Sequence, residues 1–294
     1  MGLSIFGQRM EDLNLGGTMK PGKNNEEVVH YWDSNPIHSI EFGPIEDITE
    51  YCRLVDDVRW DEHERWAEKG FLDFGGDPGA KLLDAGCGIG VFTRYYSKKG
   101  YEVSAIDITP KAVEIAQSSL EALGLKGDVR QGSVEKIPFE DNQFDYVCCN
   151  GVIHHTGDTE KAAAEILRVL KPGGRAMISV YYRNFLLTKR FFPLMKTTLS
   201  ILIRKSKLEG REKFLRAETP EDFVRIYDGD DTPIANLYNR AEGDHLFADY
   251  KILAAEPHYF PIRFFKFFKV GGLVHWALDR YCGTLIYYLL EKPA

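Results

Sequence analysis

The stretch Leu82-Leu83-Asp84-Ala85-Gly86-Cys87-Gly88-Ile89-Gly90 decides the fold of this chain. Its first half, together with Lys81, predicts a short buried strand, and its glycines predict a tight turn into a helix over residues 91–99. Glycine lets the backbone adopt unusual φ and ψ angles and approach a ligand closely. The spacing is G-x-G-x-G, which differs from the G-x-G-x-x-G of dinucleotide-binding proteins, and Asp84 stands two residues before the first glycine.

Strands and helices alternate on the C-terminal side of this stretch. Thr109, as the cap, and Pro110, in the first turn, open the next helix. We expect strands over residues 101–107, 128–131, 144–149 and 175–181, and helices over residues 109–123 and 160–170, the latter closed by Lys171-Pro172-Gly173-Gly174. This alternation predicts an α/β fold of parallel βαβ units with helices on both faces of the sheet. Two later apolar segments, residues 250–260 and 284–291, are expected to complete a seven-stranded, mostly parallel sheet.

A carboxylate ends the second predicted strand. Asp107 stands where it can accept both hydrogen bonds of a ribose diol, as the acid of NAD-binding folds does. The alternative, that Asp107 caps the following helix, is disfavoured because Thr109 is better placed for that task. Since ligands of doubly wound sheets bind outside the carboxyl ends of the strands, we expect Asp107 and the glycine loop to meet one ligand.

Five segments in register resemble a known enzyme family. They are Asp84–Gly90, Ala105–Asp107, Gly132–Phe139, Phe144–His155 and Leu167–Gly174. Together they resemble the class I S-adenosylmethionine-dependent methyltransferases, in the small-molecule branch that is similar to the ubiquinone and menaquinone biosynthesis methyltransferases. The resemblance covers about residues 81–181. It implies a Rossmann-like fold, S-adenosylmethionine as the cofactor with S-adenosylhomocysteine as the product, and methyl transfer to a small or amphipathic metabolite.

The resemblance also implies which residues bind the cofactor. The glycine loop is expected to contact the methionine part and the ribose, and Ser133 and Val134 are expected to flank the adenine. The family usually has Asp at the position of Ser133, whose hydroxyl binds the adenine amino group more weakly. Asn150 follows the fourth strand, where the family often uses a backbone carbonyl near the methionine. The expected cofactor-binding set is Asp84, Gly86, Cys87, Gly88, Gly90, Asp107, Ile108, Ser133, Val134 and Asn150.

Two adjacent histidines, His154 and His155, follow the fourth strand, where the methyl group is expected to point. An imidazole with an ordinary pKa of about 6.5 can take a proton from an acceptor hydroxyl. The alternative is that one ring packs under the loop and the other binds the backbone. We carry both as candidate catalytic bases, which favours oxygen over nitrogen or carbon as the acceptor atom. The sequence contains no metal-ligand cluster, so we expect no metal.

The parts that choose the acceptor are expected to flank the core. The chain divides into a flexible tail (1–24), an N-terminal helical cap (25–78), the Rossmann-like core (79–182), a helical lid or substrate insertion after the fifth strand (183–240), and a segment that completes the sheet (241–294). The cap either folds over the cofactor and excludes water or packs on the sheet edge. Candidate substrate-binding residues are Tyr31, Trp32 and His38 in the cap, and Tyr181, Tyr182 and Arg183 at the end of the fifth strand.

Charge is distributed unevenly along the chain. The net charge is −7, but residues 183–216 hold ten Lys or Arg against two Glu, so this segment carries +8 and the rest carries −15. Three interpretations stay open: a lid with a solvated charged face interrupted at Pro193, a pocket for an anionic or acyl-bearing substrate, and an interfacial helix on anionic lipid. The basic, aromatic segment 260–269 has the same character. We favour a lid that attracts an amphipathic acceptor, with peripheral membrane contact through its basic residues.

Several function classes are disfavoured. The acidic balance argues against nucleic-acid binding, and Asn150-Gly151-Val152-Ile153 is not the Asn/Asp-Pro-Pro-aromatic motif of nucleic-acid methyltransferases. The glycine spacing argues against an NAD-dependent dehydrogenase. The sequence shows no secretory leader and no apolar run of about 20 residues, and its five cysteines lack metal-ligand spacing, so we expect a cytoplasmic protein. A cofactor-binding scaffold without turnover and a lipid-linked acceptor methylated at the membrane surface remain alternatives, and the oligomeric state stays open.

Overall fold

The computed structural model describes residues 25–34, 47–60, 71–72, 74–75, 78–206, 212–228, 232–260 and 272–294. The expected tail and the candidate residue His38 lie outside these ranges. The strands are β1 Lys81–Ala85, β2 Glu102–Asp107, β3 Asp128–Gln131, β4 Phe144–Asn150, β5 Leu170–Tyr182, β6 Leu237–Tyr238, β7 Lys251–His258 and β8 Leu285–Glu291. The α-helices are α1 Asn25–Ser34, α3 Ile48–Val58, α4 Val91–Lys98, α5 Pro110–Ala122, α6 Thr159–Val169, α7 Phe192–Ser206, α8 Pro220–Asp228, α9 Arg240–Leu246 and α10 Gly272–Cys282, and short 3-10 helices are η2 Ile153–His155, η3 Phe185–Leu187 and η4 Glu212–Arg216.

The strands form one mixed sheet in the order β3-β2-β1-β4-β5-β8-β7, with β6 also paired to β5. The pairs among β1 to β6 are parallel, and β8 runs antiparallel between β5 and β7. The chain proceeds outward from β1 to β3 and then returns across β1 to β4. The strand order therefore reverses between β1 and β4, and the carboxyl ends of these strands are where such sheets bind ligands.

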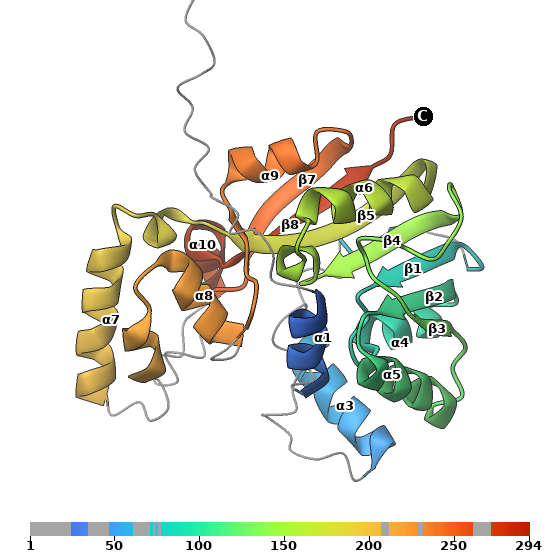
Figure 1. Ribbon diagram of the computed structural model, residues 1–294, viewed down its shortest axis with the longest axis horizontal. Coiled ribbons are helices and arrows are strands. Elements are labelled where there is room, and N and C mark those ends of the chain that lie inside the picture. Colours follow the sequence, from blue (N-terminus) through green and yellow to red (C-terminus); the bar gives the residue numbers. More distant parts are fainter. Residues whose placement is uncertain are drawn as a thin grey trace, which may run out of the picture.

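Helices cover both faces of the sheet, as the alternating pattern predicts (Figure 1). Helices α6 and α9 lie on one face, and α4 and α5 lie on the other. Neighbouring strand residues point to opposite faces: Leu83 joins the core cluster that contains Ile166 of α6, whereas Leu82 joins the cluster that contains Phe92 and Tyr96 of α4. Helices α7, α8 and α10 lie together beyond the carboxyl end of β5, at the left of Figure 1.

A buried ion pair joins a helix that precedes the sheet to the core. Arg94 on α4 is fully buried, and its Nη2 and Nε donate to the two carboxylate oxygens of Asp56 on α3. Its Nη1 donates to the carbonyl of Ile89, at 2.7 Å, and to the hydroxyl of Ser119, at 3.1 Å. Because Ile89 lies in the glycine loop and Ser119 lies on α5, this one side chain fixes α3, α5 and the loop relative to α4.

The structure corrects several details of the sequence-based expectation. Among the described residues, the main path of the sheet has the seven expected strands, and the short strand β6, from a segment with a turn-like sequence, adds an eighth beside β5. Pro193 does not interrupt a helix but lies in the first turn of α7, where a missing N–H costs nothing. The sequence Lys171-Pro172-Gly173-Gly174 lies within β5, with Gly173 at a φ of 75°. Thr109 is the N-cap of α5, but its hydroxyl binds Asp107 instead of capping the helix.

Among the described residues, the structure contains no helix that is both long and apolar enough to span a bilayer.

Candidate active site

The glycine loop between β1 and α4 takes left-handed backbone at each of its three glycines. The φ angles are 83° at Gly86, 51° at Gly88 and 83° at Gly90, values that side chains with a Cβ rarely adopt. A Cβ on Gly86 would lie 2.5 Å from both γ carbons of Val152, and one on Gly90 would lie 3.0 Å from the Cβ of Ala116. A side chain at Gly86 or Gly90 would therefore clash with Val152 or Ala116. The contact with Val152 places the loop against the segment that carries His154 and His155.

Asp107, the last residue of β2, holds the glycine loop through a backbone hydrogen bond. Its Oδ2 accepts a hydrogen bond from the backbone N–H of Gly88, at 2.8 Å, and its Oδ1 accepts from the N–H and the hydroxyl of Thr109, both at 3.0 Å. Burial raises the pKa of this carboxyl, and the backbone hydrogen bonds oppose that rise. Oδ2 keeps a second lone pair, and rotation of the Thr109 hydroxyl frees one on Oδ1, so the carboxylate fits a ribose diol placed beside the loop.

Asp84 and Cys87 lie beneath the loop. The Asp84 carboxylate is buried and accepts the hydroxyl of Thr93 at 2.6 Å, which ties β1 to α4. Burial raises the pKa of Asp84 to about 7, and the nearby charge of Asp107 adds to the rise. The Cys87 thiol packs with Ala105, and burial raises its pKa, so it is held as a thiol. Both side chains support the loop from below.

The burial of Asp84 predicts a pH dependence of stability. Its folded pKa of about 7 lies above the unfolded value of about 3.9, so the folded state holds this proton more tightly. The resulting stabilisation is complete below about pH 4 and is lost as the pH rises through about 7. The variant Asp84→Asn keeps an acceptor for Thr93, and its stability relative to the wild type should rise from about pH 4 to about pH 7 and then level off. Urea unfolding across this range measures the difference, and a constant difference would contradict the assignment.

The remaining cofactor candidates lie at the carboxyl ends of β2 and β4 and just after β3. Ile108 is half-buried, Val134 packs into the main core, and the Ser133 hydroxyl accepts the N–H of Glu135 at 3.2 Å. The Asn150 side-chain oxygen accepts the hydroxyl of Ser179, at 2.5 Å, and that hydroxyl in turn accepts the N–H of Gly151 at 2.8 Å. Ser179 is a residue that sequence reasoning missed, because only the pairing of β4 with β5 brings it beside Asn150.

Five of the predicted catalytic and substrate-binding residues meet in one ring cluster. His154 and His155 lie in η2, Tyr181 is the last residue but one of β5, and Tyr31 and Trp32 come from α1. Ring centroids are 4.1 Å apart for His154 and Tyr181, 4.3 Å for the two histidines, 5.2 Å for Trp32 and His155, and 5.0 Å for Tyr31 and Trp32. Helix α1 therefore reaches the loop that carries the histidines.

The two histidines differ in their surroundings. The Nδ1 of His155 lies 2.6 Å from the carbonyl oxygen of Ile234; because a carbonyl only accepts, Nδ1 is the donor in this contact and the ring is oriented by it. His154 is 1% exposed, and burial together with the neighbouring His155 lowers its pKa well below the usual range. Its Nδ1 has no hydrogen-bond partner among the residues that the structure describes. His154 is therefore a neutral ring that packs beneath His155.

The segment Thr232–Tyr238 contributes to the site although its sequence indicates only turns. Its Thr232 hydroxyl donates to the Tyr31 hydroxyl at 3.0 Å, its Ile234 carbonyl binds His155, and the N–H of Asn236 donates to the His154 carbonyl at 2.9 Å. Most of these contacts use backbone atoms, so side-chain identity gives no signal for them in the sequence.

Tyr182 and Arg183 lie outside the ring cluster. Tyr182 packs against the main core. Arg183 donates through Nη1 to both carboxylate oxygens of Glu242, each at 2.9 Å, and through Nη2 to the Leu237 carbonyl at 3.0 Å and to Glu221 at 3.3 Å. Arg183 thus joins the two ends of the insertion to α9, and its role as a substrate-binding residue stays a prediction.

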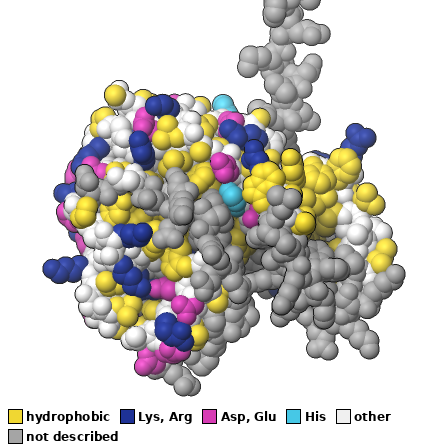
Figure 2. Space-filling view, turned by 180° about the vertical axis from the view of Figure 1, so that it is seen from behind, with side chains coloured by type: hydrophobic (Ala, Val, Ile, Leu, Met, Phe, Trp, Pro, Cys, Tyr) yellow, Lys and Arg dark blue, Asp and Glu magenta, His cyan; other side chains and the backbone are white. Residues whose placement is uncertain are grey.

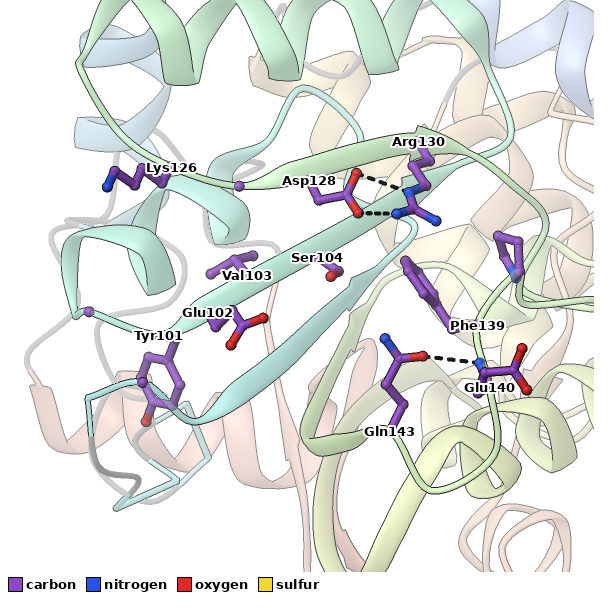
Figure 3. A pocket seen from close by; sticks show the side chains of 14 residues that line it. Tyr101, Glu102, Val103, Ser104, Lys126, Asp128, Arg130, Phe139, Glu140 and Gln143 are labelled. Carbon is purple, nitrogen blue, oxygen red and sulfur yellow. Dashed lines mark hydrogen bonds and ion pairs between the residues drawn. The ribbon is translucent and has the colours of Figure 1, made fainter.

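A cavity of about 620 Å³, drawn in Figure 3, has no residue of the ring cluster in its wall. Its wall includes Tyr101, the first residues of β2 through Ser104, and the ion pair between Asp128 and Arg130 on β3. These β2 residues form the opposite end of the strand from Asp107. The cavity is therefore separate from the carboxyl ends of the strands, where the candidate active site lies.

Comparison with known proteins gives matches over the core. Residues 83–178 match the family model described as a methyltransferase domain. A demethylmenaquinone methyltransferase of Staphylococcus aureus is 29% identical over 202 residues, which cover 60% of this chain and 81% of that protein. A ubiquinone biosynthesis O-methyltransferase of Azoarcus sp. is 35% identical over 108 residues, or 36% of this chain and 46% of that protein. This chain thus spans less than half the length of the second relative.

A solved structure shares the fold over most of the chain. The geranyl diphosphate C-methyltransferase from Streptomyces coelicolor, solved with Mg²⁺, geranyl diphosphate and S-adenosyl-L-homocysteine, superposes with a TM-score of 0.58. The match covers 93% of this chain and 100% of that one, at 16% sequence identity, so it establishes the fold alone. The residues that match the family model include the glycine loop, Asp107 and both histidines of η2.

Proposed function

Residues 83–178 form a class I S-adenosylmethionine-dependent methyltransferase domain, and from this premise we propose that the chain methylates a hydroxyl oxygen of a small or amphipathic acceptor, with His155 as the base. The observation that carries the proposal is the ring cluster: an imidazole oriented by a backbone carbonyl lies on the segment that touches the glycine loop. We place this activity in the cytoplasm, because all five cysteines are free thiols, which fits a reducing compartment.

The residues of the site divide the work of methyl transfer. S-adenosylmethionine, when bound, supplies an electrophilic methyl group on a sulfonium. The glycine loop and Asp107 hold the cofactor in one orientation, and orientation is the larger part of what such an enzyme contributes. Tyr31 and Trp32 on α1 exclude water from the ring cluster. The Nε2 of His155 takes the proton of the acceptor hydroxyl while His154 stays neutral behind it.

The ring cluster favours an acceptor that carries a hydroxyl group on an aromatic ring. Flat rings stack well against Trp32 and Tyr181, and two relatives carry the names demethylmenaquinone methyltransferase and ubiquinone biosynthesis O-methyltransferase. A ring hydroxyl that loses its proton shares the negative charge between its oxygen and the adjacent ring carbons. The same base would therefore serve transfer to oxygen or to carbon, and product analysis by mass spectrometry and NMR distinguishes the two.

The variant His155→Gln should lose turnover but keep the cofactor. We expect kcat to fall by about 10²- to 10⁴-fold, the usual contribution of a positioned base, with the dissociation constant of S-adenosylhomocysteine unchanged. The measurement is transfer of a radiolabelled methyl group to a panel of catechols, hydroquinones and amines. His245→Gln is the matched control, because His245 is an exposed residue on α9, outside the ring cluster.

Two results would contradict the role of His155. One is a kcat of His155→Gln that equals the kcat of His245→Gln. The other is turnover restricted to amines, because a neutral amine needs no base. Unchanged binding of S-adenosylhomocysteine shows that the site is still folded and makes either result decisive.

A second candidate function is methylation of a lipid-linked acceptor at a membrane surface. One observation favours it: large apolar side chains are exposed on η3, α7 and α10, and Figure 2 shows hydrophobic side chains gathered on this side of the molecule. They are Phe185, Phe191, Leu194, Ile201, Val274, Trp276 and Tyr281. Lys189, Arg190 and Arg204 are exposed in the same part of the chain, which suits an anionic surface.

A further inference from the structure

A second cavity, of about 470 Å³, lies between the insertion that follows β5 and three later residues, Phe260, Cys282 and Thr284. We call it the chain pocket; it lies between η3, α7, Phe223 of α8 and the end of α10. Its floor is buried, since Leu187 is 3% and Leu199 is 9% exposed, whereas its rim is open, since Phe191 is 41% and Leu194 is 65% exposed. The pocket is thus accessible to a ligand from solvent.

The polar side chains that line the chain pocket are already bonded to the backbone. Asn184 donates to the carbonyls of Cys282 and Gly283 and accepts from the N–H groups of Leu186 and Leu187. The hydroxyls of Thr198 and Thr284 donate to backbone carbonyls at 2.9 Å and 2.8 Å. All other lining residues carry apolar or thiol side chains. A ligand in this pocket therefore gains its affinity from apolar contact, which selects hydrocarbon.

The chain pocket adjoins the ring cluster of the active site. Tyr181, whose ring lies 4.1 Å from that of His154, packs in one hydrophobic cluster with Leu187 and Phe192. Leu187 also lines the pocket, and Phe223 packs against the same cluster. At the rim, the guanidinium of Arg190 lies 5.7 Å from the centroid of the Phe191 ring. The positive charge of this side chain is therefore next to the apolar opening.

We propose that the chain pocket binds the hydrocarbon chain, acyl or prenyl, of an amphipathic acceptor. The identification of the chain-bearing molecule as the acceptor rests on the proposed function; the affinity of the pocket for hydrocarbon does not. The basic rim favours a molecule with an anionic group near the point where the chain enters. The pocket thereby selects acceptors by chain length, and the ring cluster selects them by the head group.

The test is a titration of the full chain with linear alkyl carboxylates from hexanoate to tetradecanoate, below their micelle concentrations. Each added methylene should tighten binding by up to about fourfold until the pocket is filled. Thr198→Trp places an indole at the pocket wall. It should raise the dissociation constant of tetradecanoate on the order of 15- to 60-fold, the equivalent of two to three methylenes excluded from the pocket. Thr197→Trp is the matched control, because Thr197 is the neighbouring exposed threonine of α7 and does not line the pocket.

Two outcomes would overturn the proposal: an affinity that does not depend on chain length, or equal affinities of the two tryptophan variants for tetradecanoate. Binding of S-adenosylhomocysteine, measured on the same samples, should be unchanged in both variants and shows that the core is intact. Failure of the proposed function has a different signature. It would leave the chain-length series intact while no hydroxylated acceptor is methylated, whereas failure of the chain pocket would leave methyl transfer to short acceptors intact.

Discussion

Replacing Arg94 by methionine should lower the free energy of unfolding by about 3–5 kcal/mol, because it removes the buried countercharge of Asp56 and leaves only the exposed Lys98, whose Nζ lies 3.5 Å from the carboxylate. The guanidinium is fully buried and also binds the Ile89 carbonyl and the Ser119 hydroxyl. Methionine fills much of the same volume, so the loss reports mainly on the charge and hydrogen bonds rather than on a cavity. Urea unfolding of the wild type and the variant at neutral pH measures it.

The matched control is Arg53→Met on α3. Arg53 also pairs with carboxylates, Glu50 at 2.8 Å and Asp57 at 2.7 Å, but its side chain is 57% exposed, and such pairs contribute about 0–1 kcal/mol. The double variant Arg94→Met with Asp56→Leu should recover much of the stability, because it removes both charges together. Equal losses in Arg94→Met and Arg53→Met would contradict the account.

The central part of the fold was predictable because its signals are local. Residues 82–90 predict strand, turn and helix in one short stretch, and β1, β3, α4 and α5 begin and end within one or two residues of the expected limits. The family match confirms the predicted methyltransferase resemblance, and the strand pairing together with the solved structure confirms the mostly parallel sheet. The sequence predicts that the histidine pair follows the fourth strand and that Tyr181 lies at the end of the fifth, whereas it leaves open whether the cap with Tyr31 and Trp32 folds over the site; the structure brings all five rings together.

The contacts that complete the site are long-range, and local pattern does not reveal them. Asp56 and Arg94 are 38 residues apart, and the His155 contact with Ile234 spans 79 residues and uses a backbone oxygen. Arg183 has the basic character expected of a substrate ligand, yet three segments of the protein already bind it. Likewise, the apolar residues 185–203 predict a helical lid, whereas the chain pocket exists only because Phe223 and Cys282 close it from distant positions.

Asp107→Ala should weaken binding of S-adenosylhomocysteine on the order of 100-fold, the second large effect that we expect. Two hydrogen bonds from a diol to a charged acceptor are each worth about 1.5–3 kcal/mol, with incomplete additivity. Because Asp107 also holds the N–H groups of Gly88 and Thr109, part of the loss could come from the loop itself. An analogue without the two ribose hydroxyls separates these causes: it should bind weakly to the wild type and lose little further affinity in the variant.

The most direct test of the central claim is a calorimetric titration of the wild type and Asp107→Ala with S-adenosylmethionine, S-adenosylhomocysteine and NAD. The account predicts that the wild type binds both adenosyl ligands, that the variant binds them on the order of 100-fold more weakly, and that neither protein binds NAD. Binding of NAD without binding of the adenosyl ligands would contradict the claim that S-adenosylmethionine is the cofactor of this protein.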